Sequence, residues 1–168
     1  MKTSPVKILK SILINVLIFV SAYAAAHFYQ TKDLVVGAAP ELSGVLLDGQ
    51  FLQGLEALEK PAIIHFWATW CKICQFEHDS INRLSQDYSV ISISSHSGGY
   101  SEVKEFVAAN GVNYPVLNDA SNSVSETWGV KAFPTSFIID EENNIRFVEV
   151  GLTTEFGLRF RLWMTRFL

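Results

Sequence analysis

An uninterrupted apolar run, followed directly by a helical pattern, restricts this chain more than any other feature. Residues 61–68 read PAIIHFWA, which is typical of a strand buried on both faces of a sheet. Beyond residue 70 the large apolar residues recur at helical spacing: Ile73, Phe76, Ile81, Leu84 and Tyr88. The chain contains 2 cysteines, Cys71 and Cys74, and both lie where this strand gives way to this helix.

The segments around this junction alternate between strand and helix patterns. We expect a buried strand at residues 89–95, strands at 135–140 and 145–150 joined by a hairpin turn, and an earlier hairpin turn at Asp48-Gly49. We expect helices at 102–110, where Gly111 can end the helix, at 120–128 and at 153–168. This order predicts one α/β domain with a central mixed β-sheet flanked by helices.

The last expected helix carries an aromatic stripe: Phe156, Phe160, Trp163 and Phe167. We expect this stripe to pack against the sheet, while the stems of Arg159, Arg161 and Arg166 extend past it to solvent. The alternative is that the stripe lies on a membrane surface, where aromatic and basic residues are also combined.

The N-terminal segment predicts export and membrane attachment. Residues 11–29 contain no charged residue, and this length is close to the about 20 apolar residues that span a bilayer. Lysines precede the run, so the N-terminal end should stay in the cytoplasm and the rest of the chain should lie outside. A signal peptide cleaved at Ala24-Ala25-Ala26 is the alternative, and we favour the uncleaved transmembrane helix. In both cases the domain reaches a compartment in which disulfides persist.

The charge is divided unevenly along the chain. Residues 1–32 hold four lysines and no acid, so the remaining residues must carry −8 to reach the net charge of −4. An acidic body argues against nucleic acid as a partner. The sequence also has no glycine-rich phosphate loop, which argues against a nucleotide.

The position of the cysteines suits thiol–disulfide chemistry. Cys71 follows a strand and opens a helix, where free backbone N–H groups and the positive end of the helix dipole stabilise a thiolate. The pKa of this thiol should therefore lie below the free value of about 8.5. Lys72 adds a positive charge, Trp67 and Trp70 shield the site, and Cys74 is close enough to resolve a mixed disulfide.

Three other roles for the cysteines are open. They could be inert core residues, or they could form a structural disulfide, although so short a loop adds little stability. They could also bind copper(I) or zinc, because Cys71, Cys74 and His78 form the pattern C-x2-C-x3-H. A metal site would need a further ligand from a distant part of the chain, since the sequence has no second cysteine pair.

Two segments carry a resemblance to a known superfamily. FWATWCKIC, residues 66–74, resembles the active-site segment of thioredoxins, and WGVKAFPTSFIID, residues 128–140, resembles the segment with the cis-proline of that fold. The N-terminal apolar segment and the early hairpin are similar to the TlpA/ResA-type proteins of bacterial envelopes. The ending GLRFRLWMTRFL is similar to the copper-sensitivity suppressor D proteins, a branch of that group.

The resemblance implies roles for particular residues. Cys71 would be the nucleophile and Cys74 the resolving thiol. Pro134 would lie against the disulfide in a cis peptide after Phe133, and because proline has no N–H, the loop can face a substrate chain.

Proton handling is implied for two further residues. Glu77 completes C-x-x-C-x-x-E, as in the ResA-type pattern, where this acid assists proton transfer at the thiols. That group often has a proline two residues later, where this chain has Asp79, and a solvated helix residue is the other interpretation of Glu77. His65 takes the position of the buried acid of thioredoxin; it could act as a base, although we favour a core role.

Together these features predict a thioredoxin-like fold with an N-terminal β-hairpin extension at residues 33–168, behind a membrane anchor and linker at residues 1–32. The predicted function is a single-pass inner-membrane thiol–disulfide oxidoreductase whose domain faces the periplasm. It would take electrons from a membrane donor and pass them to the disulfides of exported proteins, as a reductase or an electron relay. Its cellular roles would be redox homeostasis and copper tolerance. The Cys71–Cys74 disulfide would need no further cofactor. A disulfide oxidase, a copper- or zinc-binding module and an anchored adaptor are the alternatives.

Overall fold

The structure is a computed structural model that describes residues 5–168 of the chain. Lys2, which belongs to the predicted basic N-terminal end, lies outside these residues. The described chain divides after Asp33 into two compact units. The assignment of residues 1–32 as an anchor and of residues 33–168 as the redox domain stays a prediction.

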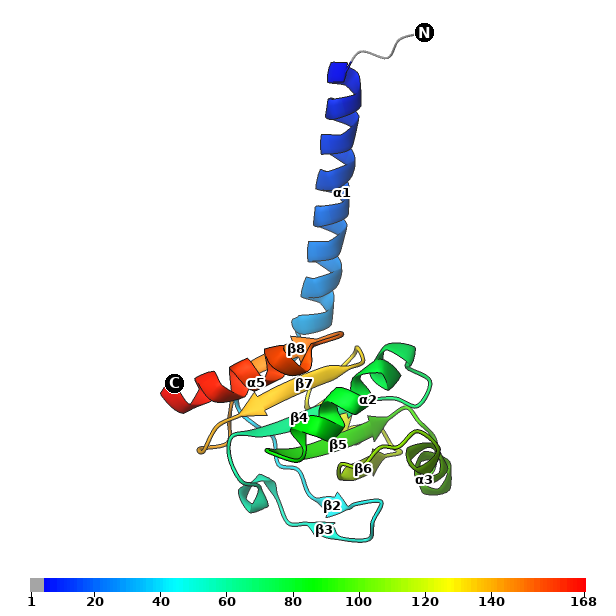
Figure 1. Ribbon diagram of the computed structural model, residues 1–168, viewed down its shortest axis with the longest axis vertical. Helices are drawn as coiled ribbons and strands as arrows, with labels where there is room; N and C mark the ends of the chain where they lie inside the picture. Colours follow the sequence, from blue (N-terminus) through cyan, green and yellow to red (C-terminus); the bar gives the residue numbers. More distant parts are fainter. Residues whose placement is uncertain (1–4) are drawn as a thin grey trace. The chain divides into compact units, whose positions relative to one another are not determined.

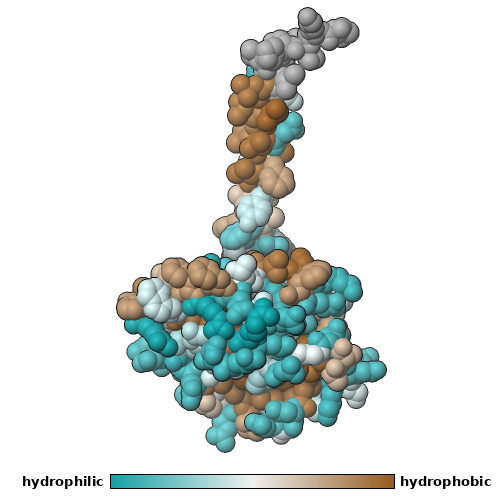
Figure 2. All heavy atoms as spheres, in the orientation of Figure 1, coloured by the Kyte–Doolittle hydropathy of each residue, from teal (hydrophilic) through white to brown (hydrophobic). Residues whose placement is uncertain are grey.

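The first unit is a single helix, α1 (Pro5–Thr31) (Figure 1). Its part Leu9–Thr31 is long and apolar enough to cross a membrane, by length and composition. Brown, apolar side chains cover much of this helix (Figure 2), and the residues of the candidate span are not buried against other parts of the chain. A signal sequence at an N-terminus shows the same length and composition.

The second unit is built on a 6-stranded mixed sheet with the order β1-β8-β7-β4-β5-β6. The apolar run forms β4 (Ala62–Trp67), which pairs in parallel with β5 (Ser89–Ser95) and antiparallel with β7 (Thr135–Ile139). On one side the sheet continues with β8 (Asn144–Val150) and β1 (Gly37–Ala38).

The sheet ends on its other side with β6 (Val116–Asp119), which the sequence analysis did not predict. This strand is short, and it follows a proline, so its sequence lacks the extended apolar run that marks β4. Its parallel pairing with β5 makes it the outermost strand of the sheet.

Helices cover one face of the sheet, and shorter elements cover the other (Figure 1). Helices α2 (Lys72–Leu84), α3 (Tyr100–Ala109) and α5 (Glu155–Met164) contribute to the same core cluster. The opposite cluster includes the hairpin of β2 (Gly44–Val45) and β3 (Phe51–Leu52), the 3-10 turn Leu55–Ala57 and the region of α4 (Ser123–Thr127). The predicted mixed sheet flanked by helices, with an early hairpin, is confirmed.

Only part of the apolar spacing of α2 faces inward. Ile73 and Phe76, which share the apolar spacing, are 48% and 79% exposed, respectively. The buried residues of the helix are Cys74, Glu77, His78, Ile81 and Leu84. Cys74, Glu77, Ile81 and Leu84 lie three or four residues apart and therefore share one face of the helix, which places Cys74 rather than its neighbours toward the core.

The expectation for α5 is wrong. Its aromatic stripe faces outward, whereas Leu158 and Leu162 are buried and join the core cluster with α2. A 3-10 turn, Thr165–Phe167, continues the helix. The two leucines fill the space over the sheet, so the larger aromatic rings remain outside.

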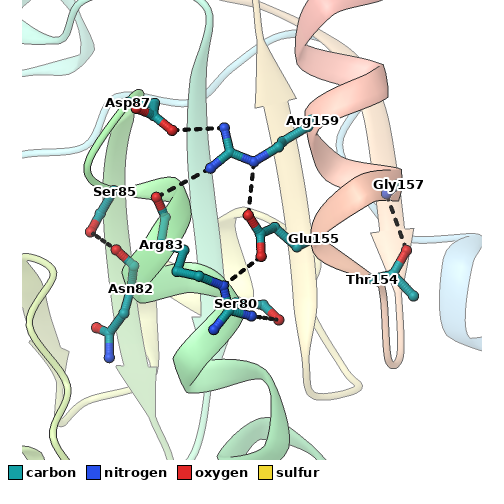
Figure 3. A network of polar contacts seen from close by, with 9 residues as sticks. All are labelled: Ser80, Asn82, Arg83, Ser85, Asp87, Thr154, Glu155, Gly157 and Arg159. Atoms are coloured by element: carbon teal, nitrogen blue, oxygen red, sulfur yellow. Dashed lines mark hydrogen bonds and ion pairs between the residues drawn. The ribbon is translucent and has the colours of Figure 1, made fainter.

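Ion pairs connect the start of α5 to the end of α2 (Figure 3). Glu155 accepts from Arg83 Nε at 2.6 Å and from Arg159 Nε at 2.9 Å. Arg159 also reaches Asp87, just beyond α2, at 2.8 Å. These contacts hold the two helices side by side above the sheet.

Candidate active site

Cys71 and Cys74 form a disulfide at the N-terminus of α2. Cys71 is the N-cap residue, and the backbone N–H of Cys74 donates to its sulfur at 3.1 Å. Cys71 is 6% exposed and Cys74 is fully buried, so the sulfur of Cys71 is the more accessible of the two. In the reduced protein the same N–H and the helix dipole would favour a thiolate at Cys71.

The loop before β7 lies against this disulfide. The carbonyl oxygen of Phe133 is 3.7 Å from Sγ of Cys71. The peptide bond between Phe133 and Pro134 is cis, and Pro134 is buried. The Phe133 ring contacts the rings of Trp70 and His96, at centroid distances of 6.0 and 5.9 Å. The structure therefore brings the loop of Phe133 and Pro134 beside Cys71, while the role of Pro134 stays a prediction.

The two tryptophans of the site have different positions. Trp67 is fully buried, and its indole N–H donates to Ser92 Oγ at 3.1 Å. Trp70 is exposed, and its N–H donates to the carbonyl oxygen of His96 at 2.9 Å. Only Trp67 shields the site from within, while Trp70 gives the surface beside Cys71 an apolar side chain.

Glu77 lies one turn after Cys74 and is buried. Its Oε1 accepts from the backbone N–H of Thr153 at 2.5 Å, while Oε2 is buried without a hydrogen-bond partner in the described part of the chain. Burial raises the pKa of this carboxyl to about 7, against the opposing effect of the Thr153 hydrogen bond. The interpretation of Glu77 as a solvated helix residue is therefore wrong.

Two histidines are buried near the site, His65 on β4 and His78 on α2. His65 Nδ1 is 2.9 Å from Ser136 Oγ, and His78 Nδ1 is 2.7 Å from the hydroxyl of Tyr114. Burial lowers the pKa of His65 to about 3 and also lowers the pKa of His78. The low pKa of His65 keeps its imidazole neutral near pH 7, which agrees with a core position better than with a general base.

The proposed metal ligands do not gather into a metal site here. Cys71 and Cys74 are bonded to each other, and His78 contacts Tyr114. Among the residues that the structure describes, no three His, Cys, Asp or Glu side chains form a group that could hold a metal ion.

A loop that the sequence analysis overlooked links the parts of this site. The N–H of Gly151 donates to the carbonyl oxygen of Pro134 at 2.8 Å, and two residues later Thr153 donates to Glu77. Both contacts use backbone N–H groups, so no side-chain pattern could reveal them. The groove beside this loop is lined by three apolar side chains and by seven polar or charged residues: Phe76, Leu152 and Phe156, with Glu77, Ser80, Arg83, Thr153, Thr154, Glu155 and Arg159.

Comparisons with known proteins agree with this geometry. The family model described as Redoxin matches residues 35–156. A thioredoxin-like protein of Haemophilus influenzae is 32% identical over 125 residues, which cover 70% of this chain and 74% of that protein.

Longer and structural matches point the same way. The thiol-disulfide oxidoreductase ResA of Geobacillus thermodenitrificans is 25% identical over 169 residues, covering 96% of this chain and 97% of ResA. The crystal structure of a thiol:disulfide interchange protein of the thioredoxin family from Chlorobium tepidum superposes with a TM-score of 0.66 at 26% identity. That match covers 79% of this chain and 98% of the solved chain.

Proposed function

The chain belongs to the Redoxin family, as a thioredoxin-like protein of the TlpA/ResA type, and from this premise we propose that it is a thiol–disulfide oxidoreductase in which Cys71 attacks and Cys74 resolves. The observation that carries the proposal is the disulfide at the N-terminus of α2, with the N–H of Cys74 directed at the sulfur of Cys71. Cys71 is also the more accessible of the two sulfurs.

The proposed reaction transfers two electrons from the dithiol to a substrate disulfide. The Cys71 thiolate attacks one substrate sulfur, so a mixed disulfide forms, the substrate S–S bond breaks, and one substrate thiolate leaves and takes up a proton. The Cys74 thiolate then attacks Cys71, which forms the Cys71–Cys74 bond and releases the second substrate thiol. The substrate gains two electrons and two protons, and the protein is left oxidised.

Glu77 and Pro134 are proposed to support these steps. Cys74 is buried, so its proton needs an acceptor before the thiol can attack. Glu77, one turn further along the same helix, has a pKa of about 7 and can therefore take up and return a proton at neutral pH. Pro134 has no N–H, which leaves the carbonyl oxygens of its loop to face the cysteines and a docked substrate chain.

The proposed direction of electron flow is reducing. Lys72 is exposed, and an exposed charge pair is worth about 0–1 kcal/mol, whereas 1.4 kcal/mol corresponds to about 30 mV for a two-electron couple. Thioredoxin and the strong oxidant DsbA differ by about 150 mV. Lys72 alone therefore stabilises the thiolate too little to make this protein a strong oxidant.

The proposed location is the inner membrane, with α1 as a single span and the domain in the periplasm. The proposed partners are exported protein thiols and disulfides, together with a membrane electron donor. The disulfide would act without a further cofactor. Copper tolerance is the proposed cellular role, on the resemblance to the copper-sensitivity suppressor D proteins.

Substrate trapping tests the assigned roles. The variant Cys74→Ala should accumulate mixed disulfides through Cys71, because no second thiol remains to release the substrate. The matched variant Cys71→Ala should accumulate none, since Cys74 is buried. Non-reducing gels and mass spectrometry of the adducts provide the measurement. Equal trapping by both variants would contradict the proposed roles of Cys71 as the attacking thiol and Cys74 as the resolving thiol.

A second experiment tests the location. A C-terminal reporter that is active only outside the cytoplasm should be active, and the full chain should remain in the membrane fraction after a carbonate wash. N-terminal sequencing of the mature protein is the control. A mature protein that began at His27 would show cleavage and remove the proposed anchor.

A further inference from the structure

Four aromatic side chains form a continuous surface on the outer side of α5 and its following turn, here called the aromatic ridge: Phe156, Phe160, Trp163 and Phe167. They are 80%, 48%, 52% and 70% exposed, in that order. Trp163 contacts Phe160 and Phe167 with ring centroids 6.0 and 4.9 Å apart. Figure 2 shows this apolar surface over the C-terminal helix.

The ridge is not needed to hold α5 on the domain. Leu158 and Leu162 are buried against α2 and the sheet, and Thr165 is also buried. The helix thus has one apolar face inside the domain and a second one outside. A second, contiguous apolar face on a folded domain marks a contact with something else.

Two of the three arginines beside the ridge form ion pairs within the domain, and the third, Arg166, is exposed. Arg159 pairs with Glu155 and Asp87 (Figure 3), and Arg161 pairs with Glu149 on β8. An acidic protein partner would have to compete with these ion pairs. A surface that accepts exposed aromatic rings beside an exposed arginine fits the ridge better, and the headgroup–acyl boundary of a bilayer is such a surface.

The chain connection keeps the domain close to a bilayer. Residues 32–36 separate the end of α1 from β1, and a fully extended segment of that length spans at most about 18 Å. A domain of residues 34–168 is expected to be about 35 Å across. The connection enters the sheet at β1, which pairs with Asn144 and Ile145 at the start of β8, and Asn144 lines one pocket together with Thr165 and Arg166 in the turn that continues α5. Because the connection is so short, binding of the domain to the bilayer becomes an intramolecular step, and the effective concentration of the domain at the membrane surface is high.

We propose that the aromatic ridge inserts into the headgroup–acyl boundary of the bilayer that α1 crosses, so that the domain is docked on the membrane and not freely tethered. This inference rests on the proposed membrane anchoring. Docking would restrict the directions in which Cys71 can face a membrane electron donor.

Tryptophan fluorescence of the full chain in nanodiscs tests the docking. The 4 tryptophans are Trp67, Trp70, Trp128 and Trp163, so none lies in α1 and all emission comes from the domain. We would compare discs that hold one chain each, made with phosphatidylcholine and phosphatidylglycerol, with and without bromine at the upper acyl positions. Quenching by the brominated lipid should fall at least twofold in Trp163→Phe.

The matched control is Trp70→Phe, because Trp70 is as exposed as Trp163 but lies beside Cys71. This variant should keep the full quenching. The pair Phe160→Ser and Phe167→Ser, introduced together, should lower the quenching of Trp163 while the reduction of the disulfide by dithiothreitol proceeds at the wild-type rate.

Each other outcome would overturn the docking. Quenching that is absent, or that is lost equally in both tryptophan variants, would show that the ridge does not meet lipid. A further set of discs would hold two chains each, and quenching by acrylamide would measure the exposure of Trp163 to solvent. If Trp163 were protected from acrylamide only in these discs, without quenching by brominated lipid, the ridge would bind a second copy of the chain. A chain that fails to elute with the discs would disprove the anchoring as well, whereas co-elution without quenching disproves the docking alone.

Discussion

Glu77 is the residue whose environment bears most directly on function. Glu77 lies on the buried face of α2, where its carboxyl accepts one backbone hydrogen bond from Thr153 and has a pKa of about 7. Burial favours the neutral acid, and the N–H of Thr153 favours the carboxylate. The balance of these two effects provides a proton carrier one turn from Cys74.

This balance predicts a pH-dependent cost in stability. In the unfolded chain the carboxyl loses its proton near pH 4.5, whereas in the folded protein it does so near pH 7. Between these values the folded state holds the additional proton, so the free energy of unfolding falls as pH rises. Glu77→Gln should remove this loss and gain at most about 3 kcal/mol relative to wild type between pH 4.5 and pH 8.

Denaturant unfolding of the oxidised full chain in detergent, at pH 4.5, 6 and 8, measures this difference. The lowered pKa of His65 acts in the opposite direction, because its stabilising effect is lost as pH falls below 6.5. The contribution of His65 is the same in the wild type and in Glu77→Gln, so it cancels when their free energies of unfolding are subtracted. Glu105→Gln, at an exposed site on α3, is the control. A pH-independent difference for Glu77→Gln would rule out the raised pKa.

At the scale of elements, α5 has two apolar faces in different environments. Its leucines pack on α2 and the sheet, and its aromatic residues face outward. The helix is further held by the ion pairs of Glu155 with Arg83 and Arg159 (Figure 3). Stability should therefore depend on the smaller side chains of this helix.

We predict that Leu162→Ala lowers the free energy of unfolding by about 2–4 kcal/mol, because it leaves a cavity in the core. Phe160→Ala removes a larger side chain but should cost less than about 1 kcal/mol, because Phe160 is half exposed. Chemical denaturation of the two variants in detergent solution compares them directly. A larger loss for Phe160→Ala would restore the expectation that the aromatic stripe packs on the sheet.

At the scale of the whole molecule, the direction of electron flow depends on the difference in reduction potential between the dithiol and its partners. The predicted reduction potential lies closer to the value of thioredoxin, about −270 mV, than to that of DsbA, about −120 mV. The physical reason is that Lys72, an exposed cation next to Cys71 in the chain, stabilises the thiolate only slightly.

Equilibration of the full chain with glutathione buffers measures this potential. Acid-quenched thiol trapping in growing cells should find the Cys71–Cys74 pair mainly reduced. Lys72→Gln is a matched variant, and its potential should shift by no more than about 20 mV. A potential near that of DsbA, with a mainly oxidised pair in cells, would make the protein an oxidase.

Much of the fold follows from the sequence by itself. The apolar run of β4, the cysteines at the strand-to-helix junction, the turn at Asp48-Gly49 and the helix end at Gly111 are local signals, and the structure agrees with each of them. Local signals suffice there because the period of apolar residues and the backbone freedom of glycine act within a few neighbouring residues.

Tertiary structure alone decided which face of each helix is inside. Ile73 and Phe76 share the apolar spacing of α2 but are exposed, whereas Cys74, Glu77 and His78 face inward together with Ile81. The same holds for α5, whose two apolar faces look alike in sequence until the space over the sheet admits leucine and leaves the aromatic rings outside. The link from Thr153 to Glu77 was also invisible, because a backbone N–H is common to nearly every residue and only folding brings this one to the acid.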